Sequence, residues 1–369
     1  MSSDASEPLP PVKQAAETIA HAVRERDVLR TTALCLAIAA GSWYLLREFA
    51  PVLRPLLLAV FLCYIILPLH HRLRQSFPGP AAIFVLAGAT AGGLLLLALL
   101  IFNSAADLTA ELPQMVRRGG QLFNQLEAWY LKNLPPWLNP SDSERTPGAP
   151  IDAAMLRNIV GHVLNAAADA ATDAVVVAIY LLFLLLEARR LPGRIQHSFA
   201  TTESDQILTV VRRINDAMAT YLWVKVKASL VLAVPVTLVL LLFGIHSAVM
   251  WGVLTFLLNF IPYLGSVIAC SAPILLAFIH LHSPWQAASL AVVLVTIHML
   301  SAYVVEPAMT GKAVGLSPLV ILISLAFWGL CWGLTGMLLA VPLTVMLQIV
   351  LDNVALTRPF ARLMGGELS

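Results

Sequence analysis

A short polar segment near the end of the chain carries the residue types best suited to chemistry. Residues 306–318 hold one acid and one base, Glu306 and Lys312, between two long apolar stretches, 289–304 and 319–350. A charged group at membrane depth is costly and usually marks the pathway of a solute or an ion. Glu306 could bind a cation or a proton. The segment's prolines and glycines could end helices and turn backbone groups toward a solute; they are Pro307, Gly311, Gly315 and Pro318. The alternative is an ordinary cytoplasmic loop, because its length is normal for a connection between helices.

A second interruption divides the apolar run 248–279. Asn259, Pro262 and Gly265 are spaced three residues apart, and a proline in this position breaks a helix and frees backbone groups. Two interrupted apolar segments are typical of the binding region of a transporter. We expect the two segments to lie close together as parts of one solute pathway, with a simple turn between two short spans as the alternative.

Two further sets of polar residues lie within or beside apolar stretches. Asp169, Asp173 and Tyr180 belong to a polar stripe that covers an arc of about 80° on a helix. They could face a cavity, or the carboxylates could mark a solvated helix end. His298 precedes Glu306 on nearly the same helix face and could relay protons to it, although a buried histidine with a hydrogen-bond partner is the commoner case.

The composition indicates a membrane protein. The 369 residues are 59% hydrophobic and 12% charged, and the mean hydropathy is +0.81. Soluble domains carry about 25% charged residues. We therefore predict an all-α, polytopic membrane helical bundle with about eight passes, broken or re-entrant helices in its C-terminal half, and amphipathic helices outside the bilayer.

The apolar pattern divides the chain into five parts. These are a cytoplasmic N-terminal segment with an amphipathic helix (1–30), three transmembrane helices (31–103), an extracytoplasmic amphipathic region (104–172), a C-terminal transmembrane bundle (173–352) and a cytoplasmic tail (353–369). Within the bundle, residues 205–227 predict an amphipathic helix that ends at Lys225 and Lys227, before a separate span from Leu230 to Phe243. The distribution of lysine and arginine places both termini in the cytoplasm.

Several classes of function are not supported by the sequence. It has no HExxH, GxSxG, Walker A or GxGxxG motif, so we expect neither an enzyme nor a nucleotide-driven pump, and no cofactor. The four cysteines lie singly in apolar runs, which argues against a metal site. A net charge of +2 argues against nucleic-acid binding. The expected partners are the lipid bilayer and a small solute, or a monovalent cation and a proton.

The motifs of the C-terminal half resemble those of the AI-2E transporter family. The resemblance is carried by Pro262-Tyr-Leu-Gly265, Val305-Glu-Pro307, Gly311-Lys-Ala-Val-Gly315 and the glycine-rich stretch from Trp328 to Pro342. It implies a multi-pass protein of the bacterial plasma (inner) membrane that exports a small polar solute such as autoinducer-2. It also implies a homo-oligomer, with a pentamer as one expected form. Sodium or lithium/proton antiport and a non-transporting membrane scaffold remain as alternatives.

Overall fold

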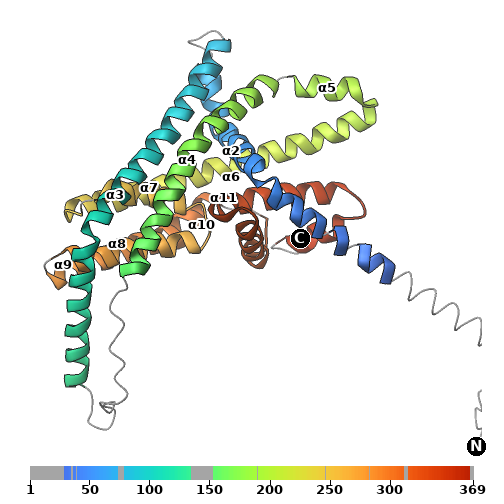
Figure 1. Cartoon of the computed structure of the whole chain (residues 1–369). Helices are drawn as coiled ribbons and strands as arrows, with labels where there is room; N and C mark the ends of the chain where they lie inside the picture. Colours follow the sequence, from blue (N-terminus) through green and yellow to red (C-terminus); the bar gives the residue numbers. More distant parts are fainter. Residues whose placement is uncertain are drawn as a thin grey trace, which may run out of the picture. The chain divides into compact units, whose positions relative to one another are not determined.

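The structure of the protein is a computed structural model that describes residues 29–34, 36–38, 40–73, 79–133, 153–188, 190–245, 247–281, 283–310 and 315–365. These residues are helical apart from short turns and one isolated bridge between Leu316 and Gly365 (Figure 1). The chain divides into two compact units at Val52. The first unit contributes the helix Leu29–Glu48, in which most of the described large apolar side chains are exposed.

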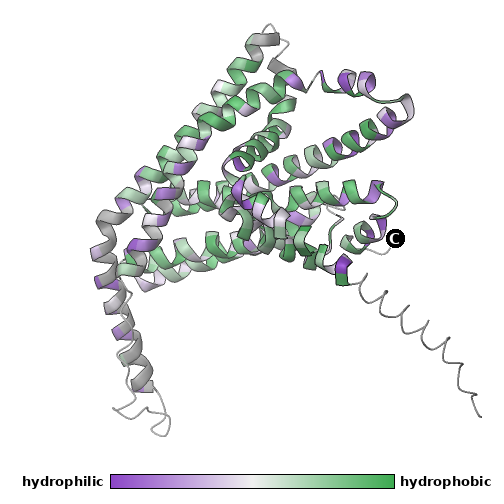
Figure 2. Cartoon of the chain, turned by 45° about the vertical axis from the view of Figure 1, so that its right-hand side comes forward, coloured by the Kyte–Doolittle hydropathy of each residue, from purple (hydrophilic) through white to green (hydrophobic). Residues whose placement is uncertain are grey.

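The all-α membrane bundle predicted from the sequence is confirmed. Seven helices of the described chain are long and apolar enough to cross a bilayer; they are Leu29–Glu48, Ala50–Leu67, Ile83–Asp107, Ala167–Glu187, Thr201–Leu242, Pro284–Met309 and Pro318–Asn353. Two shorter apolar helices are α7 (Ala248–Leu258) and α8 (Leu264–His280). Hydrophobic residues cover most of these helices, whereas α5 (Leu191–Ser198) is largely hydrophilic (Figure 2).

The first helices of the second unit form a group of three: α2 (Ala50–Leu73), α3 (Gly79–Asn133) and α4 (Ala153–Glu187). Helices α3 and α4 run side by side (Figure 1), and the buried side chains that join the group are Ala59, Ile83, Val177, Leu181 and Leu185. The last of the three transmembrane helices predicted within residues 31–103 is the first half of a 55-residue helix. The chain therefore leaves the apolar region without breaking its helix.

Helix α6 (Thr201–Leu242) is one continuous helix where the sequence predicts two. The prediction ends an amphipathic helix at Lys225 and Lys227, before a separate span from Leu230 to Phe243. In the structure the helix continues past Lys225, and Glu306 pairs with this residue, which offsets the cost of its charge.

Two helical hairpins pack against α6. The first consists of α7, the turn at residues 259–263, and α8. The second is α11 (Pro318–Asn353), which folds back on itself at Gly333, where φ is 64° and ψ is −140°. Its arms, 318–332 and 334–353, lie side by side. The evidence is a contact between them, in which the Trp328 Nε1 atom is 3.4 Å from the Thr344 Oγ1 atom. In a straight helix the same two residues would be about 24 Å apart.

The two hairpins approach α6 from opposite ends. The base of the first hairpin, at Ala248 and Ala277, packs with Leu240 near the C-terminal end of α6. The base of the second hairpin lies near the N-terminal half of α6, where the Asp352 carboxylate is 3.8 Å from the Arg213 guanidinium. The tip of the first hairpin reaches the second hairpin. Ile261 of the first turn shares a buried cluster with Leu325 and Ala340, one from each arm of the second hairpin.

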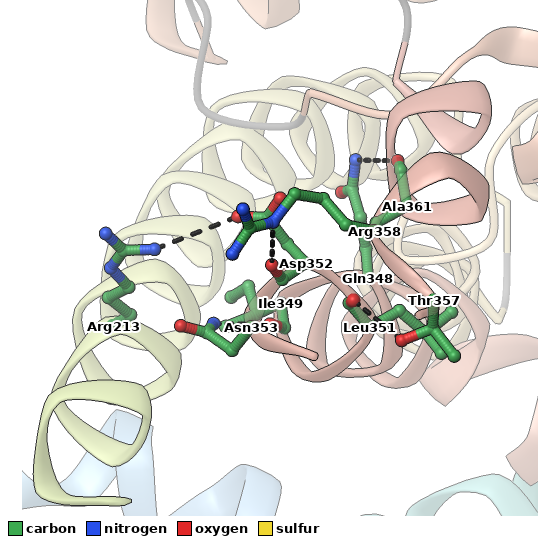
Figure 3. Close-up of polar contacts among 9 residues, drawn as sticks. All are labelled: Arg213, Gln348, Ile349, Leu351, Asp352, Asn353, Thr357, Arg358 and Ala361. Carbon is green, nitrogen blue, oxygen red and sulfur yellow. Dashed lines mark hydrogen bonds and ion pairs between the residues drawn. The ribbon is translucent and has the colours of Figure 1, made fainter. Parts of the chain in front are cut away.

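The C-terminal helix α12 (Arg358–Met364) ties the two ends of the second hairpin together. The Ser317 amide donates a 2.9 Å hydrogen bond to the Met364 carbonyl. From the other arm, Gln348 Nε2 donates to the Ala361 carbonyl at 3.3 Å (Figure 3). Arg358 Nε donates to the Asp352 carbonyl at 2.9 Å (Figure 3). These bonds connect the segment that follows residue 314 to the end of the hairpin.

Candidate functional site

An ion pair between α6 and α10 (Glu306–Thr310) is the centre of the candidate site. The Lys225 ammonium group donates a 2.6 Å hydrogen bond to the Glu306 carboxylate. Their side chains are 13% and 31% exposed, so the pair is largely enclosed by the protein. Both residues belong to helices that are apolar enough to span a bilayer. Each charge therefore neutralises the other in a region where an unpaired charge would be costly.

A π-helical turn aims Glu306 at this position. Helix α9 (Pro284–Leu300) passes into the π-helix η2 (Ser301–Val305), and the Glu306 amide donates a hydrogen bond back to the Ser301 carbonyl. A π-turn contains one more residue than an α-turn, so residue i+5 stacks over residue i. Glu306 thus lies above Ser301, a buried residue of η2 that continues the packed face of α9. Single π-turns of this kind occur frequently at functional sites.

The first broken segment contacts α6 one helical turn further along. Asn259 Nδ2 donates a 3.1 Å hydrogen bond to the Ser229 hydroxyl, and both side chains are buried. Ser229 follows Lys225 by four residues and therefore lies on the same face of α6. The structure thus places Asn259 and Glu306 against adjacent turns of one helix.

Apolar packing joins the same two segments. Phe260, next to Asn259, and Leu316, at the end of the polar segment, belong to one buried cluster with Tyr221 and Leu222 of α6. Phe260 also makes an edge-to-face contact with Phe61 of α2, with ring centroids 5.7 Å apart. A common core therefore supports the polar contacts on both sides of the site.

The turn of the first hairpin is strained. Tyr263 has φ 63° and ψ −61°, and the Leu264 amide donates a 2.7 Å hydrogen bond to the Pro262 carbonyl. This is the rare form of the γ-turn. Such a conformation in a residue other than glycine costs about 1–3 kcal/mol and persists only where the surrounding structure holds it. The hairpin packing therefore stabilises a turn that the local sequence would not adopt alone.

The comparison with known proteins decides the family. The model of the AI-2E family transporters matches residues 33–356. The chain belongs to the AI-2E transporter family. It is 29% identical over 311 residues to the AI-2 transport protein TqsA of Escherichia coli K12, which covers 84% of this chain and 88% of that protein. It is 31% identical over 327 residues to a Haemophilus influenzae protein whose name proposes a transport role without naming a solute, covering 86% and 90% of the two chains.

Membership of the AI-2E family establishes a multi-pass protein that transports a solute across a membrane. The region matched by the family model contains every described contact of the candidate site. It also suggests that the protein is not an enzyme. Among the described residues, no group of three or more His, Cys, Asp or Glu is placed to hold a metal ion.

Apart from the stripe on α4, the structure places the other predicted site residues of this AI-2E family member as follows. Pro307 is the second residue of α10, Pro318 opens α11, and Gly315 is exposed just before it. Gly311 and Lys312 lie outside the described residues. His298 is buried on α9, one turn before Ser301.

The stripe on α4 belongs to a different part of the AI-2E fold. Tyr180 packs with the cluster that joins α2, α3 and α4. Asp169 is exposed, Asp173 is half-buried, and the charged neighbour of Asp173 on another helix is Arg54 of α2. None of the described contacts joins these residues to Lys225 and Glu306.

Sequence reasoning missed Lys225 and Ser229 as site residues, although it named both of their partners. Lys225 looked like a helix-ending cation because it is followed closely by Lys227. The signal that could have identified it is Glu306, because a carboxylate at membrane depth requires a cation from another helix.

Proposed function

We propose that the protein exports a small polar solute similar to autoinducer-2 from the cell, along the face of α6 that carries Lys225 and Ser229. The observation that supports this most directly is the enclosed Lys225–Glu306 pair with the Asn259–Ser229 contact one turn away. Together these groups offer charged and neutral hydrogen-bond partners on a membrane-spanning helix. A passing solute could exchange its water contacts for them.

The proposed pathway lies where the two opposed hairpins meet. Asn259 belongs to the turn of the first hairpin, and Leu316 precedes the second. Irregular backbone at membrane depth is tolerated where protein covers it or where it lines an aqueous cavity. The proposal places the protein in the bacterial plasma membrane as a homo-oligomer with both termini in the cytoplasm. The name of the TqsA relative supports autoinducer-2 as the solute.

The test is the release of autoinducer-2 from proteoliposomes that contain the purified protein. We expect Glu306→Gln and Lys225→Ala each to reduce the initial rate at least tenfold. The matched control is Glu187→Gln, because Glu187 also pairs with an arginine, Arg194, but at an exposed helix end. Wild-type protein that releases no more solute than empty liposomes would overturn the proposal.

The same liposomes separate export from the alternatives. The family match does not favour cation/proton antiport, and the pairing of Glu306 with Lys225 already balances the carboxylate's charge. Antiport would appear as a sodium or lithium flux that follows an imposed pH gradient and that Glu306→Gln abolishes. A scaffold would give no flux of any solute or ion.

A further inference from the structure

Five buried polar side chains lie at one level along α6. They are Ser229, Thr255, Asn259, His298 and Ser301, and each is at most 7% exposed. They come from three elements that pack together: α6, the first hairpin, and α9 with η2. Buried polar groups in a membrane-spanning bundle require hydrogen-bond partners, because no lipid can supply them.

The contacts between neighbouring helices determine the position of each of these residues along the axis of α6. Helices α6 and α7 are antiparallel, because Gly252 packs against Thr237 and Asn259 bonds to Ser229. With a rise of about 1.5 Å per residue, Thr255 lies beside the turn of α6 that follows Ser229.

Helix α9 also runs antiparallel to α6. Glu306 pairs with Lys225, whereas Leu294 and Leu290 share a cluster with Val236 and Leu240. The residues between these two contacts, Ser301 and His298, therefore lie level with residues 229–232 of α6. They continue the buried face of α9 formed by Ala287, Leu290 and Leu294.

Most of these polar atoms have no partner within the described chain. Asn259 bonds to Ser229. By contrast, both ring nitrogens of His298, the Ser301 hydroxyl and the Thr255 hydroxyl are buried without a hydrogen-bond partner among the described residues. Leaving a buried donor or acceptor unpaired typically costs about 1–3 kcal/mol. Four such atoms at one level leave hydrogen-bonding capacity that the described part of the chain does not satisfy.

We propose that His298 and Ser301, with Thr255 of α7 at the same level along α6, form an internal binding site for an uncharged solute that carries hydroxyl or carbonyl groups. This inference rests on the proposed transport function and assigns the chemical class of the solute. A neutral imidazole offers one donor and one acceptor, and each hydroxyl offers both. The set carries no net charge when the imidazole is neutral, so it complements a neutral polyhydroxylated molecule rather than an ion. The Lys225–Glu306 pair lies at one end of this site, because Glu306 follows Ser301 by one π-turn.

Thiol accessibility tests the site without requiring transport. Ser301→Cys is introduced into a variant that lacks the native Cys35, Cys63, Cys270 and Cys331, and the protein in nanodiscs is treated with the charged reagent 2-sulfonatoethyl methanethiosulfonate. We expect Ser301→Cys to react at least tenfold faster than two controls on α9. Leu294→Cys lies on the same buried face, and Val292→Cys is 66% exposed on the outer surface of the chain, where lipid would cover it.

A neutral probe then tests the solute class. Ribose, a neutral polyhydroxylated sugar, should slow the modification of Ser301→Cys severalfold, and an equal concentration of choline chloride should not. A reaction rate no greater than that of Leu294→Cys, or a rate that ribose leaves unchanged, would overturn the inference. If Ser301→Cys does not yield folded protein, Thr255→Cys probes the same site from α7 with the same expected outcomes.

The outcome of the thiol-modification experiment can be distinguished from a failure of the export proposal. A Ser301→Cys thiol that reacts and is protected by ribose supports the site even if autoinducer-2 is not released from proteoliposomes.

Discussion

Gly265 lies directly against the backbone carbonyl of Leu258: a Cβ atom on residue 265 would stand 1.7 Å from the Leu258 oxygen. The second hairpin has the same construction, since a Cβ atom on Gly336 would stand 1.9 Å from the Trp328 oxygen. In both hairpins a glycine just after the turn lets the returning arm touch the outgoing arm. The hairpin tips can therefore remain narrow where they meet beside α6.

Gly265→Ala should destabilise the protein. The added methyl group would contact backbone atoms that cannot move without displacing the whole arm, and such overpacking costs about 1–3 kcal/mol. We expect a lower Tm in a thermal unfolding assay in detergent. The control is Gly161→Ala in α4, where a Cβ atom would meet no heavy atom within 4 Å. An equal change in Tm for the two variants would contradict the close packing at Gly265.

Gly333→Ala tests the fold of the second hairpin through the backbone alone. No heavy atom lies within 4 Å of a Cβ atom at this position, but the positive φ of 64° is strained for alanine. A cost of about 1–3 kcal/mol is expected, together with slower release of autoinducer-2 from proteoliposomes. In the control, Gly329→Ala, the three heavy atoms nearest to the new methyl group all belong to the flexible Met337 side chain. The methionine can move aside, so this variant should retain more of its stability.

The two arms of α11 should be linked by a short bifunctional thiol reagent. Trp328 and Thr344 are replaced by cysteine in the variant that lacks native cysteines, and cross-linking within one chain is detected by mass spectrometry after proteolysis. Their side chains meet in the structure, whereas a straight helix would hold them about 24 Å apart. Cysteines at Ile207 and Trp223 have the same spacing on the continuous helix α6 and should not be linked. Equal yields from both pairs would refute the folded hairpin.

Deleting residues 358–369 should lower the Tm. The deletion removes the Met364 carbonyl that binds the Ser317 amide and the buried Ala361. Arg213→Gln breaks only the exposed 3.8 Å pair with Asp352, and such pairs contribute about 0–1 kcal/mol. The deletion should therefore shift the Tm more than Arg213→Gln does. A truncated protein with the Tm of the full chain would show that α12 does not secure the hairpin.

The sequence predicted the class of fold and one half of the candidate site. Apolar stretches near the length of a bilayer predicted a helical membrane bundle, because composition and span length are local properties. Asn259 and Glu306 were found because a break or a charge within an apolar run is visible without a structure. The break at Pro262 was equally visible, although its γ-turn at Tyr263 was not.

The partners of these residues depended on the tertiary structure. The sequence pattern placed Lys225 at the end of an amphipathic helix, and only the structure shows that this residue pairs with Glu306 from within a helix that continues to Leu242. The spacing of the polar stripe on α4 allowed either a cavity-facing side or a solvated helix end, and only the structure shows that Tyr180 packs within the α2–α4 group. A periodic pattern identifies a helix face but does not identify what that face contacts.

By itself, the sequence determined that this protein is a polytopic helical membrane protein with two broken segments, because hydrophobicity and helix-breaking residues act locally. The three-dimensional fold decided that the broken segments meet on adjacent turns of α6. It also decided that a π-turn brings Glu306 above Ser301. Pairings between residues far apart in sequence depend on how whole helices pack, and this information is not contained in the pattern of any single segment.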